Sequence, residues 1–371
     1  MPNYGNDAAL SLAEPVTAAV PPPPAALRLT IDAQALAGNW RALDRLSGAA
    51  AAGAAVKADA YGLGAARVVP ILSQAGCRDW FVAHWSEVPD VLPHAAPASI
   101  HVLHGPMNAA DLAYARATGV TPVLNSLAQI RRWQESGGGQ CDLMVDTGIN
   151  RLGLPLADLG DPALAGLDID CCISHLASAD EDVAQNAQQL AHFNAVRAQV
   201  PARRYSLANS AGIALGAPWH ADLTRPGIAL YGGIVRSELA GVITQVARPQ
   251  AAVIQLRHLS LGDKVGYNAT FTADRPIRAA VIALGYADGY LRAWSGRGKL
   301  QWQGNVLPVI GRVSMDMTIV DATAAPGLAE GDWLDLLYDL PQASEISGLS
   351  QYELLTLLGS RFLREKALPA Y

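Results

Sequence analysis

Short apolar segments alternate with helical stretches between residues 54 and 224, and this alternation restricts the fold more than any other feature. Each apolar segment is followed by a loop and then by apolar residues at helical spacing. Strands separated by helices of this length form a parallel sheet with right-handed crossovers, and eight of them can close into a barrel. The pattern predicts a (β/α)8 barrel with eight strands, at 54–57, 80–83, 100–103, 121–124, 141–145, 169–174, 205–207 and 223–224.

The pattern changes at about Ser237, which indicates a second domain. The later apolar segments are β-rich and are separated by turns at Gly262-Asp263 and Gly331-Asp332. A chain of 371 residues that is 51% apolar is long enough for two buried cores. We therefore predict an α/β plus β architecture with a barrel at 27–236 and a mostly β domain at 237–371, preceded by a disordered tail at 1–26 that contains four consecutive prolines.

Charge and cysteine content exclude several classes of partner. A formal net charge of −6 provides no basic surface for nucleic acid or for an anionic membrane. No uninterrupted apolar run is long enough to span a membrane. The four cysteines have no metal-ligand spacing, so they are expected to be buried apolar residues, and no metal is expected. We therefore expect a protein of the reducing cytoplasm that acts on a small molecule.

Polar residues follow the predicted strands at the edge where parallel α/β folds carry their active sites. Lys57 ends the first strand, and a lysine there can become a nucleophile if burial or a nearby cation lowers its pKa. A lysine in this position is more often an ordinary solvated side chain, Ser210 could simply cap a helix, and His175 could be a core histidine. The other candidates at this edge are Tyr61, residues 146–151, Asn209, Arg225 and Gly227.

Six segments together carry a family resemblance. They are VKADAYG at 56–62, DTGINRLG at 146–153, SHLASAD at 174–180, RPGIALYG at 225–232, GYADG at 285–289 and GRVSMD at 311–316. In this order and at these spacings they resemble the motifs of the alanine racemase family, over a match from about Leu27 to the C-terminus. The resemblance implies a fold-type III pyridoxal phosphate enzyme, with a (β/α)8 barrel followed by a β domain, that interconverts L-alanine and D-alanine and supplies D-alanine for peptidoglycan.

The resemblance also implies roles for particular residues. Lys57 would bind pyridoxal 5'-phosphate covalently and act as one base, and Tyr286 of the partner subunit in a homodimer would act as the other. Arg225 would face the pyridine nitrogen and, since a guanidinium accepts no proton, keep that nitrogen unprotonated. The remaining assignments are His175 against the ring, Tyr61, Asn209, Ser210, Gly227 and Ile228 around the phosphate, and Arg151 and Met315 at the substrate.

Two positions depart from the family pattern. Met144 stands where many relatives have a lysine that supports the substrate arginine, so something else must orient Arg151. The segment 352–361 is also expected to lack the tyrosine with which many relatives complete the phosphate site.

Three other functions compete with alanine racemisation. A broad-specificity amino-acid racemase would differ only in the volume of its pocket, which the sequence does not give. A fold-type III decarboxylase typically sets an acidic residue against the pyridine nitrogen, and Arg225 argues against that. A non-catalytic cofactor-binding protein would need only the barrel, and the β domain with Tyr286 and Met315 argues against it.

Overall fold

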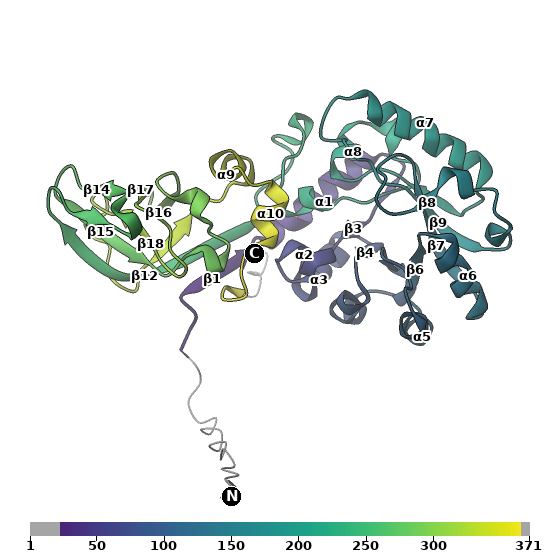
Figure 1. The fold of residues 1–371 in the computed structure, drawn as a ribbon, viewed down its shortest axis with the longest axis horizontal. Coiled ribbons are helices and arrows are strands. Elements are labelled where there is room, and N and C mark those ends of the chain that lie inside the picture. Colours follow the sequence, from purple (N-terminus) through teal and green to yellow (C-terminus); the bar gives the residue numbers. More distant parts are fainter. Residues whose placement is uncertain (1–22, 365–371) are drawn as a thin grey trace, which may run out of the picture.

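The computed structural model describes residues 23–364, which form two lobes joined side by side (Figure 1). Most of the expected tail at 1–26 lies outside the described residues. Within the described part, no helix is long and apolar enough to cross a membrane. All four cysteines are buried and unpaired.

The larger lobe is a closed barrel, as predicted. Seven strands form one parallel sheet in chain order: β3 (Ala54–Ala55), β4 (Trp80–Val82), β5 (Ile100–Val102), β6 (Thr121–Leu124), β7 (Gln140–Asp146), β9 (Asp168–Ile173) and β10 (Arg204–Ser206). The eighth, β11 (Leu223–Thr224), pairs with β2 (Ala51–Ala52), which directly precedes β3. The Asp222 amide donates to the Tyr205 carbonyl at 2.9 Å, so β11 also touches β10 and the ring is complete.

Helices surround the barrel, and polar side chains fix where several of them begin. Asp32, Asn108 and Ser126 each accept a hydrogen bond from an amide of the first helical turn that follows them. The helices are α1 (Ala33–Ser47), α3 (Ala65–Ala75), α4 (Val88–Val91), α5 (Ala109–Thr118), α6 (Leu127–Glu135), α7 (Ala184–Gln199) and α8 (Ser210–Ala214). Between β7 and β9 the structure has no helix but the short strand β8 (Leu154–Pro155) and two 3-10 turns, which differs from the expected alternation.

The smaller lobe is built on a mostly antiparallel sheet. Its order is β15 (Ile277–Ile282), β18 (Thr318–Asp321), β17 (Asn305–Ile310), β16 (Lys299–Trp302), β19 (Trp333–Leu336), β12 (Ala247–Leu259), β1 (Leu27–Ile31) and β20 (Leu363–Arg364). Between β12 and β15 in the chain, β13 (Lys264–Val265) and β14 (Phe271–Thr272) form a separate two-stranded antiparallel ribbon. The mostly β second lobe is thus confirmed.

Strand β1 lies in a different sheet from the one expected. The sequence interpretation placed residues 27–31 with the barrel, whereas β1 pairs antiparallel with β12 of the second sheet. Its side chains alternate between buried and half-buried, which suits a sheet with one face on a core. The described part of the chain therefore starts in the smaller lobe, builds the barrel, and returns to the smaller lobe.

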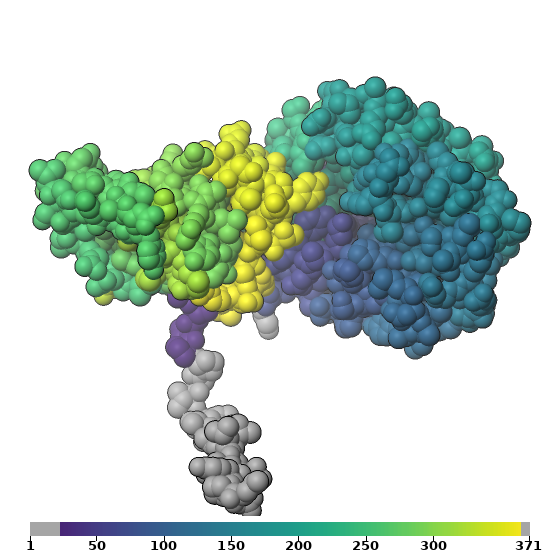
Figure 2. All heavy atoms as spheres, viewed as in Figure 1, coloured from purple at the N-terminus to yellow at the C-terminus, as the bar shows by residue number. Residues whose placement is uncertain are grey.

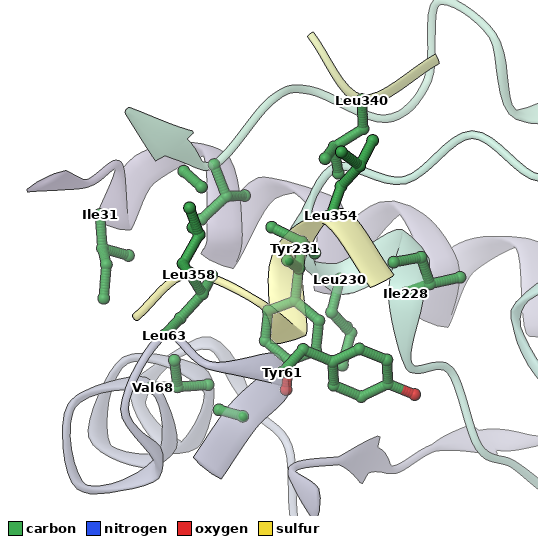
Figure 3. Packing of buried hydrophobic residues seen from close by; sticks show 14 of the residues in the cluster. Ile31, Tyr61, Leu63, Val68, Ile228, Leu230, Tyr231, Leu340, Leu354 and Leu358 are labelled. Carbon is green, nitrogen blue, oxygen red and sulfur yellow. The ribbon is translucent and has the colours of Figure 1, made fainter. Parts of the chain in front are cut away.

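The C-terminal segment packs between the lobes. Helix α9 (Leu340–Ser347) is followed by α10 (Gln351–Thr356), and this segment fills the junction in the space-filling view (Figure 2). In the core beneath it, Leu354 and Leu358 lie beside Tyr61, Tyr231 and Ile228 of the barrel (Figure 3). Residues of the C-terminal segment thus pack against Tyr61, four residues after Lys57.

Candidate functional site

A cavity of about 610 Å³ opens at the carboxyl ends of the barrel strands. All the site residues predicted in the barrel line it: Lys57, Tyr61, Arg151, His175, Asn209, Ser210, Arg225, Gly227 and Ile228. They follow five different strands, β3, β7, β9, β10 and β11, so the closure of the barrel brings together residues that are distant in sequence. Apolar side chains such as Phe81, Leu103 and Met144 complete the wall.

Lys57 has the surroundings of a reactive amine. It begins α2 (Lys57–Tyr61), directly after β3, and is half-buried. Burial lowers its pKa from the usual 10.5, Arg151 and Arg225 lower it further, and Glu87 acts in the opposite direction. Within residues 23–364, the Lys57 side chain forms no hydrogen bond or ion pair, so the amine is available to a ligand.

Three segments, after β3, β10 and β11, form a cradle of N–H and O–H groups at one side of the cavity. The Ser210 hydroxyl oxygen accepts from the amides of Gly227, at 2.9 Å, and Ala229, at 3.3 Å, which leaves its proton free to donate. A Cβ at position 227 would lie 2.3 Å from the Tyr61 hydroxyl, so only glycine fits. Burial raises the pKa of Tyr61, which therefore keeps its proton and can donate to an anion.

Arg225 is fixed on the floor of the cavity. Its guanidinium donates to the Ser174 carbonyl at 2.5 Å and to the Ser206 hydroxyl. Burial lowers its pKa to about 10, which still leaves it charged at neutral pH. Burial and the cations Arg225 and Lys57 lower the pKa of His175 to about 3, so this imidazole is neutral. The floor thus presents a cation that cannot accept a proton beside an uncharged ring.

Arg151 is the one exposed cation among the predicted barrel residues of the cavity. Within the described chain it forms no hydrogen bond or ion pair. Met144 is buried in the same wall, and its thioether carries no charge that could orient a guanidinium. A forked cation without a protein partner is suited to a carboxylate ligand.

A single chain does not bring Tyr286 and Met315 to this cavity. Both lie in the second lobe, where the Tyr286 amide donates to the Ser314 carbonyl at 3.0 Å. The Tyr286 ring is half-buried, with the Arg292 guanidinium carbon 5.3 Å from its centroid. The Met315 side chain is 53% exposed.

Sequence reasoning was wrong about the segment 352–361, because a tyrosine of this segment does reach the cavity. Tyr352 lies in the first turn of α10 and lines the wall, with its ring centroid 6.3 Å from that of Tyr61. Ser350 and Glu353 form a capping pair at the start of this helix, and this pair was the signal in the sequence that could have predicted a helix here. The position of α10 depends on packing between the lobes, which no local pattern reveals.

Tyr267 of the second lobe was also missed. It lines a smaller hollow of about 350 Å³ with Ser314 and Met317, which flank Met315 in the loop. Its side chain is 69% exposed, more than that of any other large apolar or aromatic residue described except Leu261. An exposed phenol beside a predicted substrate-binding loop is a candidate functional group.

The chain is similar to known proteins over almost all its length. Two family models match, "Alanine racemase, N-terminal domain" at residues 31–235 and "Alanine racemase, C-terminal domain" at 246–366. An alanine racemase of Methylobacterium nodulans is 43% identical over 91% of this chain and 95% of its own. A biosynthetic alanine racemase of Agrobacterium fabrum is 41% identical over 92% and 94%. A crystal structure of alanine racemase from Bartonella henselae with covalently bound pyridoxal phosphate superposes with a TM-score of 0.84 at 36% identity, over 91% of this chain and 99% of that one.

Proposed function

This chain belongs to the alanine racemase family, and we propose that it interconverts L-alanine and D-alanine with pyridoxal 5'-phosphate bound in the barrel cavity. The convergence of a free amine, a proton-donating cradle and a fixed arginine in one cavity supports this proposal most strongly. A homodimer in the cytoplasm that supplies D-alanine for peptidoglycan follows from the family, and four buried unpaired cysteines suit a reducing compartment.

The residues present fit this cofactor. The hydroxyls of Tyr61 and Ser210 and the backbone around Asn209, Gly227 and Ile228 would hold its phosphate, because they offer donors where only a small backbone fits. Tyr352 is a further donor at the same wall. Lys57 would bind the cofactor covalently, and its lowered pKa favours the nucleophilic amine. When bound, the cofactor supplies a ring that stabilises negative charge at the substrate α-carbon.

The fixed arginine limits that stabilisation. Arg225 would face the ring nitrogen with His175 against the ring. A guanidinium with a pKa of about 10 can donate a hydrogen bond to that nitrogen but is too weak an acid to protonate it, and His175 is uncharged. A ring nitrogen that stays unprotonated withdraws fewer electrons, which favours prompt return of the α-proton over side reactions. Arg151 would hold the substrate carboxylate.

Racemisation needs a second base on the opposite face of the α-carbon from Lys57. We place this base on the partner subunit, whose second lobe would cover the mouth of the cavity in a homodimer. Tyr286 is the candidate that the resemblance gives, with Met315 near the substrate. Tyr267 is a second candidate, because its 69% exposed ring can reach another subunit without rearrangement, whereas the Tyr286 ring is half-buried in its own lobe.

Borohydride reduction of the holoenzyme followed by peptide mapping tests the cofactor lysine. The label is expected on Lys57, and a label on any other lysine would refute the assignment. Assays across several amino acids distinguish an alanine racemase from the broad-specificity alternative. Release of carbon dioxide instead of racemisation would support the decarboxylase, which we consider less favoured because of Arg225.

Mixing two inactive variants tests the composite site and identifies the tyrosine. Lys57→Ala is combined under subunit exchange with Tyr267→Phe, and separately with Tyr286→Phe. In a mixed dimer one site has both lesions and the other has neither, so random assortment should restore roughly a quarter of wild-type activity. The tyrosine whose phenylalanine variant is inactive alone and is complemented by Lys57→Ala is the second base. Demonstrated exchange without any recovery would place both bases in one chain.

A further inference from the structure

Lys57 is followed by a backbone conformation that L-amino acids seldom adopt. Ala58, Asp59, Ala60 and Tyr61 all have φ between 52° and 58°, which makes a single turn of left-handed helix. Each such residue costs about 1–2 kcal/mol relative to a right-handed conformation. A run of four persists only where the surroundings hold it. This turn begins at Lys57 and ends at Tyr61, and both side chains line the cavity.

A carboxylate from the neighbouring βα unit contacts the start of this turn. Glu87 ends a 3-10 turn, Trp85–Glu87, in the loop after β4. Its Oε1 accepts from the Ala58 amide at 2.6 Å, and its Oε2 accepts from the amides of Ala83 at 2.7 Å and His84 at 3.1 Å. Bonds from N–H groups to an ionised carboxylate are about twice as strong as neutral ones. One side chain thus joins the loops after β3 and β4.

We propose that Glu87 is a positioning residue, which holds the left-handed turn through the Ala58 amide and thereby sets the direction of the Lys57 side chain. The proposal rests on the function proposed above for Lys57. The other side-chain hydrogen bonds of this segment lie further along it, where the Arg364 side chain donates to the Gly62 carbonyl at 2.9 Å and Asp59 accepts from the Ala65 amide at 2.7 Å. Among these side chains, only Glu87 holds the residue next to Lys57.

The charge of Glu87 gives a second way to detect this role. Burial and Arg151 lower the pKa of Lys57, and the nearby Glu87 carboxylate opposes them. Removing the charge while keeping the shape should therefore lower the pKa of Lys57 further. A contact that only stabilised the loop would not move this pKa.

The experiment compares Glu87→Gln with Glu330→Gln. Glu330 is a matched control, because its carboxylate also accepts from a backbone amide, that of Leu256 at 2.9 Å, but it lies in the turn before β19, in the second lobe. A glutamine at position 87 keeps one acceptor and turns an NH2 group toward N–H donors. In the holoenzyme, we expect amide exchange in the peptide 57–64 to become at least about tenfold faster, because a bond to a charged group is lost. We expect kcat to fall about tenfold with little change in KM, and the acidic limb of the pH–rate profile to move to lower pH.

Glu330→Gln should leave the exchange of 57–64, kcat and the pH profile as in the wild type. Unchanged exchange of 57–64 in Glu87→Gln, or an unmoved pH profile, would overturn the proposal. If Glu87→Gln does not fold, Glu87→Asp keeps the charge but is one methylene too short to reach all three amides, and it should show faster exchange in the same peptide. The exchange measurement does not depend on which lysine borohydride labels, so failure of this proposal and failure of the proposed function are separable.

Discussion

The barrel contains two polar clusters, one lining the cavity and one formed by residues of the barrel strands, and they are built in opposite ways. In the cavity, Lys57 and Arg151 form no hydrogen bond within the described chain. Deeper in the barrel, His101 lies between Asp142, at 2.6 Å, and Asp79, at 3.3 Å. Arg204 then joins Asp79, at 2.8 Å, to Asp170, at 2.5 Å. The upper cluster is cationic and unpaired, whereas the deeper cluster is paired throughout.

Phe81 connects the two clusters without mixing them. Its ring stacks on His101 with centroids 4.6 Å apart, and the Arg225 guanidinium carbon lies 5.8 Å from the same ring. The comparison shows how one barrel separates two tasks. Buried charges that are fully paired fix the fold, and charges left without protein partners are available to ligands. The variants below test whether activity and stability separate in the same way.

The largest effect should come from removing the free amine. Lys57→Ala should lower racemase activity by more than about 10³-fold, because both cofactor attachment and one base are lost. Its free energy of unfolding should stay within about 0.5 kcal/mol of wild type, since no paired partner is left behind. Activity assays and urea unfolding of the cofactor-free proteins measure the two quantities. Large destabilisation by this variant would mean that the amine has a structural partner.

The opposite pattern is expected for the deeper cluster. Asp142→Asn should lower the free energy of unfolding by about 3–5 kcal/mol, because the buried, charged His101 ring loses a carboxylate that balances it. Asp161→Asn is the control, since it breaks an exposed pair with Arg131 at 3.2 Å and should cost at most about 1 kcal/mol. Urea unfolding of both variants gives the comparison. Equal effects would show that the deeper pairing contributes no more than a surface pair.

The upper cluster was largely predictable from the sequence, and the deeper one was not. Lys57 and Arg151 follow strands β3 and β7, and in a parallel barrel the carboxyl ends of all strands lie on one face, so their convergence follows from the alternation. His101 and Asp142 lie within strands, where sequence alone gives no reason to pair them. Their contact depends on which side chains share a layer inside the barrel, and this layer depends on the stagger of the strands.

The misplaced and missed elements have a similar cause. β1 takes its position from pairing with the distant strand β12, and Tyr352 takes its position from the packing of α10 against the Tyr61 turn. Such contacts join residues far apart in the chain and have no periodicity. The exposed Tyr267 was missed because a phenol on a surface loop has no local pattern, and only its exposure marks it.

The deeper cluster should also make stability depend on pH. Burial opposes the charging of His101, but Asp142 and Asp79 outweigh it and raise its pKa from 6.5 to about 9. The stabilisation is therefore fully present below about pH 6.5 and is lost as the pH rises through about 9. A difference of this size corresponds to about 3 kcal/mol. Urea unfolding at pH 6.5 and pH 9.5 should show that loss in the wild type and a smaller one in His101→Asn; equal slopes would contradict the raised pKa.

The smallest effect should come from the unpaired arginine of the upper cluster. Arg151 is one of the cations that lower the pKa of Lys57, so Arg151→Gln should raise that pKa toward 10.5. Lys57 acts as a base only when deprotonated, and the acidic limb of the pH–rate profile should therefore move to higher pH, by less than about one unit for a single exposed charge. KM should rise as well, because the substrate carboxylate loses its forked partner. Arg203→Gln, which removes an exposed cation paired with Asp168 at the other end of the barrel strands, should change neither quantity. A shift to lower pH in Arg151→Gln would mean that Arg151 does not act on Lys57 as a nearby charge, and the view of the upper cluster as a group of mutually repelling cations would then be wrong.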